Sequence, residues 1–396
     1  MKKILVGFLA VVAMMFTTAA VKAADQSVAG GFEASGNILT GFGWQKYKNG
    51  AGFGAASRGV MGNYLSATNA AGVATTKAGE GKFNFFLDSV ELDLAKSFGE
   101  NVRFRTDLLF GATNLGSGAR FAPAGSAGVG SGNNGAVFIE QAYATANFAV
   151  GNGLEFLLGR FDAPFGYEAV NAHALNTISH SVFFQSGIRP STLTGAKFFY
   201  PFSDSVDLNF YIVNNLTVDA VHELVADSKK PDFGFRLGYS WGEEGAQSTV
   251  GLSAAGGWDT NGGALKEKLL YLADVDFNVK ATDSFAVGGE VLYRGGDEVL
   301  GGGTKAKDYA ALLNLNYNFS DVWDGTLQYA FTKDSGTGNS GALTGVVGTY
   351  HEIALAGGYA IADGAKFKLE ANYTMLSGVA PKPSVMGLAG AFSYNF

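Results

Sequence analysis

The strongest constraint on this chain is an alternation of apolar and polar side chains with a period of two residues. In 269–280 every second residue from Tyr271 to Val279 is apolar, and most of the positions between them carry Asp or Asn. The segments 308–319 and 365–376 follow the same rule. A strand places such residues on opposite faces of a sheet, whereas a helix would scatter the charges around its circumference. The pattern therefore predicts a sheet with one apolar and one polar face.

Sixteen segments that carry or approximate this alternation are predicted to be strands. Their ranges are 30–44, 83–95, 101–111, 137–149, 154–162, 191–200, 206–214, 232–241, 247–258, 269–280, 284–294, 308–319, 324–333, 349–360, 365–376 and 386–396. The inward and outward faces are hardest to assign in 137–149 and 191–200, so fourteen and eighteen strands stay open as alternatives. Short connections alternate with longer links along the chain, which is typical of bacterial outer-membrane barrels.

The composition narrows the class of protein further. Charged residues make up 16% of the chain and aromatic residues 13%, whereas a disordered chain would have few aromatic residues and a high net charge. No cysteine is present, which excludes a disulfide framework and a thiolate metal site. Beyond the N-terminal segment no apolar stretch approaches 18 residues, so helical membrane spans are excluded. We therefore predict an all-β protein, a transmembrane antiparallel up-and-down β-barrel with short periplasmic turns and long external loops.

The N-terminus is typical of a secretory signal peptide. Lys2 and Lys3 precede an apolar run from Ile4 to Phe16, and small residues follow. This apolar run is too short to cross a bilayer as a helix, which takes about 20 residues. We expect residues 1–23 to be removed and residues 24–396 to form the outer-membrane barrel of a Gram-negative cell.

The C-terminus carries an alternation of its own, formed by Gly390, Phe392, Tyr394 and the terminal Phe396. This ending resembles the signal by which the barrel-assembly machinery recognises outer-membrane proteins. The expected partners are therefore outer-membrane lipid and, during biogenesis, that machinery, with a homotrimer as a weaker expectation. Acidic residues outnumber basic ones by 35 to 28, so the basic footprint of a nucleic-acid-binding protein is absent.

Three long links, 45–82, 112–136 and 163–190, are rich in small and polar residues and are predicted to be external loops. The third differs from the others because it contains several aromatic residues, among them Phe165 and Phe183. We expect this third loop to be ordered and to pack inside the lumen.

Alternation nominates a set of charged side chains that face the lumen. The set is Glu91, Asp93, Arg103, Arg105, Asp107, Arg160, Asp162, Lys197, Arg236, Asp274, Asp276, Glu290, Arg294, Glu352, Lys368 and Glu370. A wall of mixed sign suits a general hydrophilic pore, whereas rings of one sign mark an ion-selective filter. The predicted pore-lining and constriction residues are Arg103, Arg105, Asp107, Arg160, Asp162, Glu168 and Arg189.

The third loop also raises the alternative of an outer-membrane phospholipase, since Ser179, Ser181 and His180 lie close together in it. Such catalysis requires a nucleophile and a base held within hydrogen-bond reach on a rigid support, and no distinctive motif surrounds these residues. The four histidines lack the spacing of metal ligands. We expect neither an enzyme activity nor a metal or cofactor.

A group of short motifs between Phe138 and Asn215 carries a family resemblance. The motifs are Ile139-Glu140-Gln141-Ala142-Tyr143, Gly159-Arg160-Phe161, Pro164-Phe165-Gly166-Tyr167-Glu168, Ser179-His180-Ser181, Thr194-Gly195 and Val213-Asn214-Asn215. This segment resembles the putative β-barrel porin-2 family, also called OmpL-like. The resemblance implies an outer-membrane barrel that acts as a diffusion pore. One departure is His180, where the family is expected to favour Arg.

Together these patterns favour a water-filled porin for the passive diffusion of small hydrophilic solutes and ions, because sixteen strands leave room for an aqueous channel. One alternative is a barrel whose external loops mainly bind a partner, as an adhesin or a structural anchor. The phospholipase is the other.

Overall fold

We describe the fold from a computed structural model of the chain. The structure describes residues 27–28, 31–48, 81–111, 136–214, 216, 230–243, 246–259, 268–296, 306–334, 348–378, 382 and 384–396. The predicted signal peptide lies outside these residues, as do most of the predicted external loops 45–82 and 112–136. No helix among the described residues has both the length and the apolar character needed to span a membrane.

Almost all of the described chain is antiparallel sheet. The strands are β1 (Ser27–Val28), β2 (Phe32–Lys48), β3 (Gly81–Phe98), β4 (Val102–Gly111), β5 (Ala136–Phe148), β6 (Leu154–Asp162), β7 (Thr192–Pro201), β8 (Val206–Val213), β9 (Asp232–Trp241), β10 (Ser248–Asp259), β11 (Lys268–Lys280), β12 (Phe285–Gly296), β13 (Ala306–Asn318), β14 (Trp323–Asp334), β15 (Gly348–Ala362), β16 (Ala365–Ser377) and β17 (Ser384–Asn395). The short β1 pairs only with the start of β2.

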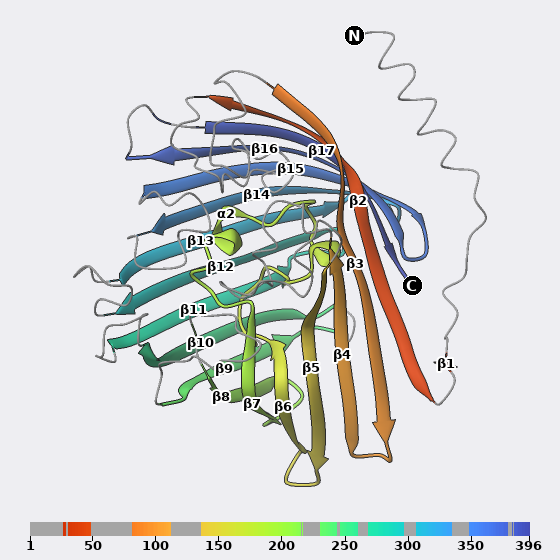
Figure 1. The fold of residues 1–396 in the computed structure, drawn as a ribbon, viewed down its shortest axis with the longest axis vertical. Helices are drawn as coiled ribbons and strands as arrows, with labels where there is room; N and C mark the ends of the chain where they lie inside the picture. Colours follow the sequence, from red (N-terminus) through yellow and green to blue (C-terminus); the bar gives the residue numbers. More distant parts are fainter. Residues whose placement is uncertain are drawn as a thin grey trace.

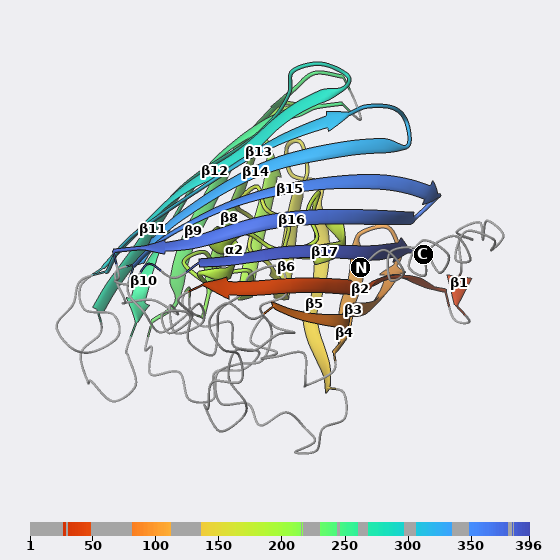
Figure 2. The same cartoon turned by 90° about the horizontal axis from the view of Figure 1, so that it is seen from above.

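The sheet closes on itself. Each strand from β2 to β17 pairs with its neighbour in sequence, and β17 pairs back onto β2, with Leu388 opposite Trp44 and Tyr394 opposite Ile38 (Figures 1 and 2). Closure leaves no unpaired sheet edge, which is the condition for a sheet to sit in lipid. The prediction of sixteen strands is confirmed, and each predicted range overlaps one strand from β2 to β17.

The two faces of the barrel differ as the alternation predicts. Apolar side chains such as Leu252, Val275 and Leu369 are 43 to 53% exposed and form the outer face. Their neighbours in sequence, such as Ser253 and Asp274, are at most 1% exposed and face the interior. The exposed apolar face is therefore the surface that contacts lipid.

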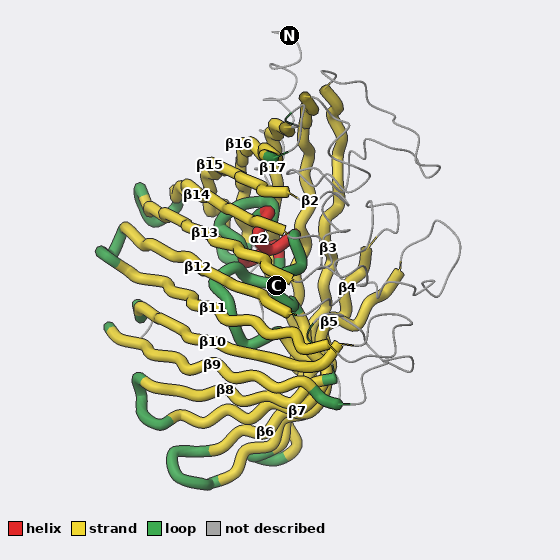
Figure 3. The backbone as a smooth tube through the Cα atoms, turned by 90° about the vertical axis from the view of Figure 1, so that its left-hand side faces the viewer, coloured by secondary structure: helices red, strands yellow, loops and turns green. Residues whose placement is uncertain are grey.

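Short turns join consecutive strands at one end of the barrel (Figure 3). The tightest has two residues, Asp363 and Gly364, between β15 and β16. Gly364 has a φ of +73°, the left-handed conformation that such a hairpin turn requires. Short turns of this kind mark the periplasmic end of a bacterial barrel.

A β-bulge explains why the faces of 137–149 are hard to read from the sequence. Asp107 of β4 lies opposite Gln141 of β5, but the next residue of β4, Leu108, lies opposite Ile139. Glu140 is therefore an extra residue, and both Glu140 and Gln141 are buried whereas Ile139 is 43% exposed. A bulge interrupts the period of two and re-aims a side chain.

The segment between β6 and β7, residues 163–191, lies inside the barrel, and we call it the inward loop (Figures 1 and 3). It contains a 3-10 turn, η2 (Ala172–Ala174), and one helical turn, α2 (Val182–Gln185). Inside the barrel, α2 contacts β13, β14 and β15, whereas η2 contacts β2. The expectation that the third long link is ordered and folds into the lumen is confirmed.

Candidate functional site

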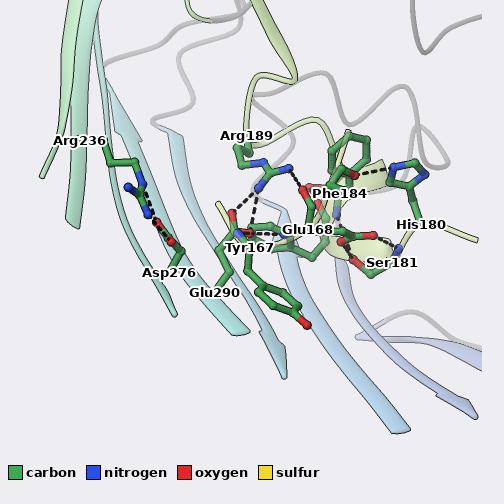
Figure 4. A network of polar contacts seen from close by, with 12 residues as sticks. Tyr167, Glu168, His180, Ser181, Phe184, Arg189, Arg236, Asp276 and Glu290 are labelled. Carbon is green, nitrogen blue, oxygen red and sulfur yellow. Dashed lines mark hydrogen bonds and ion pairs between the residues drawn. The ribbon is translucent and has the colours of Figure 1, made fainter. Parts of the chain in front are cut away.

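The candidate site is the inward loop together with the barrel wall that it contacts. Arg189, near the end of the loop, donates from Nη1 to both carboxylate oxygens of Glu290 on β12, at 2.9 and 3.1 Å (Figure 4). The backbone N–H of Tyr167, near the start of the loop, donates to the same carboxylate at 2.7 Å. The side chains of Arg189 and Glu290 are 2% and 0% exposed. One buried acid of the wall therefore holds both ends of the loop.

A second buried acid, Glu168, organises the loop from within. Its carboxylate accepts hydrogen bonds from the backbone N–H and the hydroxyl of Ser181, the first at 2.7 Å (Figure 4). The Ser181 hydroxyl also accepts from the N–H of Phe184 at 3.2 Å and so caps α2. Burial raises the pKa of Glu168 to about 7, although the bonds from Ser181 lower it. The charge of this group therefore changes near neutral pH.

Two residues of β16 hold the middle of the loop. Glu370 accepts from the backbone N–H groups of Ile178 and Ser179 and from the Ser179 hydroxyl, the last at 2.7 Å. Lys368, two residues away, donates from Nζ to three loop carbonyls, those of His173, Leu175 and Thr177. Here the wall binds the polar groups of an irregular backbone, which cannot satisfy one another as a helix or sheet does.

Glu91 of β3 provides a further attachment. Its Oε1 accepts from the side-chain amide of Asn171 at 3.2 Å, and its Oε2 lies 3.9 Å from Nδ1 of His173. Burial and the nearby Lys368 both lower the pKa of His173, so this imidazole is neutral at physiological pH. The contact of His173 with Glu91 is therefore that of a neutral ring with a carboxylate.

Apolar residues of the loop pack against apolar residues of the inner wall. The cluster around α2 consists of Val182, Phe183 and Ile188 from the loop and Leu292, Ala310, Leu312, Ala330, Tyr350, Leu376 and Val385 from the strands. A separate cluster joins Ala172, Leu175 and Ile178 of the loop to Leu39, Phe86, Ala389 and Ala391 of the wall. The inward loop therefore covers the parts of the lumen that are not polar.

Glycines make room for this packing. A Cβ at Gly288 of β12 would lie 2.1 Å from the ring of Tyr167, so the ring occupies the space that a side chain would fill. Gly166 has a φ of +94°, and a Cβ there would lie 1.5 Å from the guanidinium of Arg189. A side chain at either position would displace the contacts that fix the loop to β12.

The predicted constriction residues fall into two groups in the structure. Arg103 and Arg105 are 48% and 35% exposed along their side chains, and they form ion pairs with Glu33 at 2.6 Å and with Asp107 at 2.7 Å. The other predicted residues are buried or, in the case of Asp162, half-buried. They are Asp107, Arg160, Asp162, Glu168 and Arg189. Of these, Glu168 and Arg189 act as attachments of the loop, and Arg160 donates from Nε to the carbonyl of Glu140 at 2.9 Å.

Many of the other nominated lumen-facing charges also engage partners within the barrel. Arg236 pairs with Asp276 at 2.8 Å, and Arg294 pairs with Asp308 at 2.7 Å. Glu352 accepts from the hydroxyl of Thr374 at 3.0 Å. Such cross-strand pairing is how buried charges are tolerated in a sheet.

Three kinds of functional residue escaped the sequence analysis. Glu140 is not among the predicted lumen-facing residues, because its inward direction depends on the bulge in β5. Glu33 and Asp308 were not nominated, although each pairs with a nominated arginine. The apolar residues of the inner wall could not be identified from the sequence. An apolar residue at an inward position only interrupts the alternation, and nothing local shows that the inward loop packs on it.

The serines and histidine of the loop do not form a nucleophile and base. The hydroxyls of Ser179 and Ser181 donate to Glu370 and Glu168, and both serines are buried. Nε2 of His180 lies 3.0 and 2.9 Å from the carbonyl oxygens of Ala169 and Val170, and its ring stacks on Phe184. These contacts are those of residues that fix a loop.

The C-terminal residues lie at the closure of the barrel. Phe396 exchanges backbone hydrogen bonds with Gly36, both at 3.0 Å, and its ring stacks on that of Tyr394. Phe392 and Phe396 are 37% and 45% exposed. A Cβ at Gly390 would lie 2.4 Å from the ring of Phe42, so this glycine gives space to an aromatic neighbour. Recognition by the assembly machinery stays a prediction.

Comparison with known proteins shows similarity over most of the chain. The model of a family described as putative beta-barrel porin-2, OmpL-like, matches residues 61–385. No curated protein matches the sequence at a significant level.

Several solved structures share the fold. The outer membrane channel DcaP of Acinetobacter baumannii has a TM-score of 0.62 at 13% identity, covering 94% of this chain and 100% of that one. An anion-selective porin from Comamonas acidovorans has a TM-score of 0.59 at 11% identity, covering 92% and 99%. OprB of Pseudomonas putida has a TM-score of 0.54 at 11% identity, covering 92% and 94%. At these identities the similarity shows the barrel fold.

Proposed function

Because the chain belongs to the putative beta-barrel porin-2, OmpL-like, family, we propose that it is a water-filled channel for the passive diffusion of small hydrophilic solutes and ions. The family places it in the outer membrane as a porin. Diffusion of solutes, as distinct from the channel fold, is the part that we infer.

The observation that supports diffusion is a set of solvent-exposed charges on the inner wall. Arg105 and Asp93 form a pair that is 35% and 18% exposed, and Arg103 and Glu33, each the second residue of its strand, form one at the end of the barrel that is 48% and 59% exposed. Arg103 and Arg105 alternate with outward Phe104, which is 41% exposed on the other face. Exposed charges of both signs inside a barrel require water there and favour the passage of hydrophilic solutes.

We infer that the inward loop sets the narrowest part of this path. The loop is tied to β12 by Glu290 and to β16 by Lys368 and Glu370, so its position in the lumen is fixed from several sides. In this proposal Arg103 and Arg105 line the path. The buried members of the predicted set, such as Arg160 and Arg189, act by holding the wall and the loop in place.

Single-channel recording in planar bilayers tests the proposal. Purified protein should produce conductance steps, and its reversal potential in a salt gradient should shift toward cation selectivity in Arg105→Ala, since a positive charge leaves the path. The matched variant Arg160→Ala removes a buried arginine and should shift the reversal potential less. Absence of conductance steps from correctly folded protein would contradict a diffusion channel, whereas equal shifts in the two variants would contradict only the assignment of lining residues.

We also propose that the protein forms a homotrimer and that residues 1–23 are removed on export. One similar structure, OmpT of Vibrio cholerae, is described in a trimer form, with a TM-score of 0.54 at 11% identity. On the outer face of β10, Ala254 and Gly256 form a low surface on which another subunit could pack closely. Migration of the unheated protein on a denaturing gel, at about three times the monomer mass, would support the trimer.

A further inference from the structure

Tyrosine and lysine side chains gather on the outer face of β11 to β14, at the end of the barrel opposite the short turns. The rings of Tyr271, Tyr293 and Tyr309, on three successive strands, follow one another with centroids 6.0 and 5.0 Å apart. Lys307 and Lys333 lie beside this row and are exposed. We call Tyr271, Tyr309, Lys307 and Lys333 the rim lysine site. Apolar side chains cover most of the outer face, so two cations on it require a physical reason.

Both lysines point away from the lumen. On β13, Asp308 lies between Lys307 and Tyr309 and is buried inside the barrel, so its two neighbours face outward. On β14, Thr332 is 0% exposed, so Lys333 next to it faces outward as well. Lys333 lies opposite Tyr309 in the register, and its Nζ is 6.0 Å from the centroid of that ring. The two lysines therefore flank one tyrosine on the lipid-facing surface.

The height of the site along the barrel matches the lipid headgroups. Trp323, at the short-turn end of β14, is 54% exposed, and its ring centroid lies 4.6 Å from that of Tyr359, as in an aromatic girdle. Lys333 follows Trp323 by ten residues on the same strand, and a transmembrane strand takes about 9–11 residues to cross the hydrocarbon. A lysine on the lipid face is costly at the bilayer midplane but not near the interface. Lys333 therefore lies at the level of the external headgroups.

A tyrosine hydroxyl lies at the same level as the lysines. A Cβ at Gly295 of β12 would lie 2.6 Å from the hydroxyl oxygen of Tyr271, so this hydroxyl occupies the space above the glycine. Gly295 lies opposite Tyr271 on one side and opposite Lys307 on the other. The tyrosine therefore reaches across β12 toward Lys307. Among the described residues of β11 to β14, the outer-face positions include no Asp or Glu, so this surface carries hydrogen-bond donors and positive charge.

We propose that the rim lysine site binds a phosphate group of a phosphorylated glycolipid, the characteristic lipid of the external leaflet of an outer membrane. Ammonium and hydroxyl groups donate to phosphate oxygens, and lysine is a common ligand of phosphate. Below the site, the outward side chains of Val291, Leu313 and Leu327 are 41 to 57% exposed and offer an apolar surface to acyl chains. A lipid that joins phosphate to acyl chains matches both parts of this surface. The inference rests on the outer-membrane location and does not depend on what the channel conducts.

Titration of the purified barrel in a non-ionic detergent with lipid A, followed by native mass spectrometry, tests the site. The double variant Lys307→Gln and Lys333→Gln should bind lipid A about thirtyfold more weakly than the parent, since each lysine near an anionic lipid contributes about fivefold. The parent should bind dephosphorylated lipid A more weakly by a similar factor. Both substitutions lie on the surface of the barrel, and heat-dependent gel migration shows whether the variant is folded.

The matched control is Lys96→Gln, which removes a lysine at the short-turn end of β3. Nζ of Lys96 lies 4.7 Å from the ring centroid of Phe32 and 5.4 Å from that of Phe98, so this lysine also packs on aromatic rings. The control should keep the lipid A affinity of the parent, because it changes the opposite interface. An equal loss in the control, or equal lipid A affinity in the parent and the folded double variant, would overturn the proposal. So would tighter binding of phosphatidylglycerol than of lipid A by the parent, which would assign the surface to a phospholipid.

Discussion

Two parts of the inner wall carry buried acids in very different surroundings. On β12 and β16, Glu290 and Glu370 each accept hydrogen bonds from backbone N–H groups of the inward loop, and each has a side-chain donor as well. On β3 to β5, Asp93 and Asp107 face each other, and an oxygen of Glu140 has no partner among the described residues. The acids of the first wall are each held by several donors from the inward loop, whereas the second wall brings acids face to face.

The difference shows that alternation decides only which way a side chain points. The cost of burying a carboxylate depends on the donors that another part of the chain supplies. Glu290 is an attachment point because the inward loop supplies Arg189 and a backbone N–H group as its donors. On β3 and β4 the acids share Arg105 and accept from amide side chains such as Gln141 and Asn37, so carboxylates lie close together with fewer donors from the loop.

The largest effect is expected from Arg189→Ala, which removes the buried ion pair between the inward loop and β12. This change leaves Glu290 buried without its cation, and removal of one partner from a buried ion pair costs about 3–5 kcal/mol. The free energy of unfolding, measured in urea by tryptophan fluorescence, should fall by this amount, and single-channel currents should become noisier as the loop loosens. An unfolding free energy within 1 kcal/mol of the parent, on the order of a surface pair, would show that the loop does not depend on this contact.

A smaller effect is expected from pH, through Glu168 of the loop. Its pKa in the folded protein is about 7, against an ordinary value of 4.5, so between these pH values the folded state binds more protons than the unfolded state. The contribution of Glu168 to the free energy of unfolding should therefore be highest below pH 4.5. It should fall by on the order of 3 kcal/mol between pH 4.5 and 7 and stay constant above pH 7.

Glu168→Gln isolates this contribution, since Gln keeps an oxygen for the Ser181 donors but does not titrate. Unfolding free energies measured at pH 5 and pH 8 should differ less in the variant than in the parent. A pH dependence that is the same in both proteins would assign the titration to other groups.

The smallest effect is expected from Arg103→Ala, which removes a pair with Glu33 that is exposed on both sides. Exposed ion pairs contribute about 0–1 kcal/mol, so the unfolding free energy should change by no more than this. The loss of unfolding free energy in Arg103→Ala is then compared with that in Arg189→Ala, which shows how much more the buried ion pair stabilises the barrel than the exposed one. A loss above 2 kcal/mol, about twice the ceiling for exposed pairs, would mean that the Arg103 pair is less accessible to water than its exposed surface indicates.

The strands could be read from the sequence because lipid outside and polar groups inside impose a period of two on each one. The ranges 154–162 and 232–241 agree with β6 and β9 to the residue. The faces of 137–149 resisted assignment because one bulge residue, Glu140, shifts the period within the strand.

The candidate site was less accessible to sequence reasoning. Charged residues such as Arg189 and Glu168 were nominated, but their burial was not foreseen, because burial depends on the loop that folds over them. Leu292 and Leu312 face the lumen as apolar residues, which contradicts the simple alternation until Phe183 of the loop is placed against them.

The sequence by itself predicted that the chain crosses lipid as a closed barrel, that sixteen strands or a neighbouring even number build it, and that the segment after Asp162 is ordered. These properties follow from local periodicity and composition, which can be read in each segment without knowing the rest of the fold. Only the tertiary structure decided which inner-wall charges meet a partner, since Glu290 lies 101 residues from Arg189 and Glu370 lies 191 residues from Ser179. Pairing across such separations is set by the closure of the barrel around the loop, and no local pattern records it.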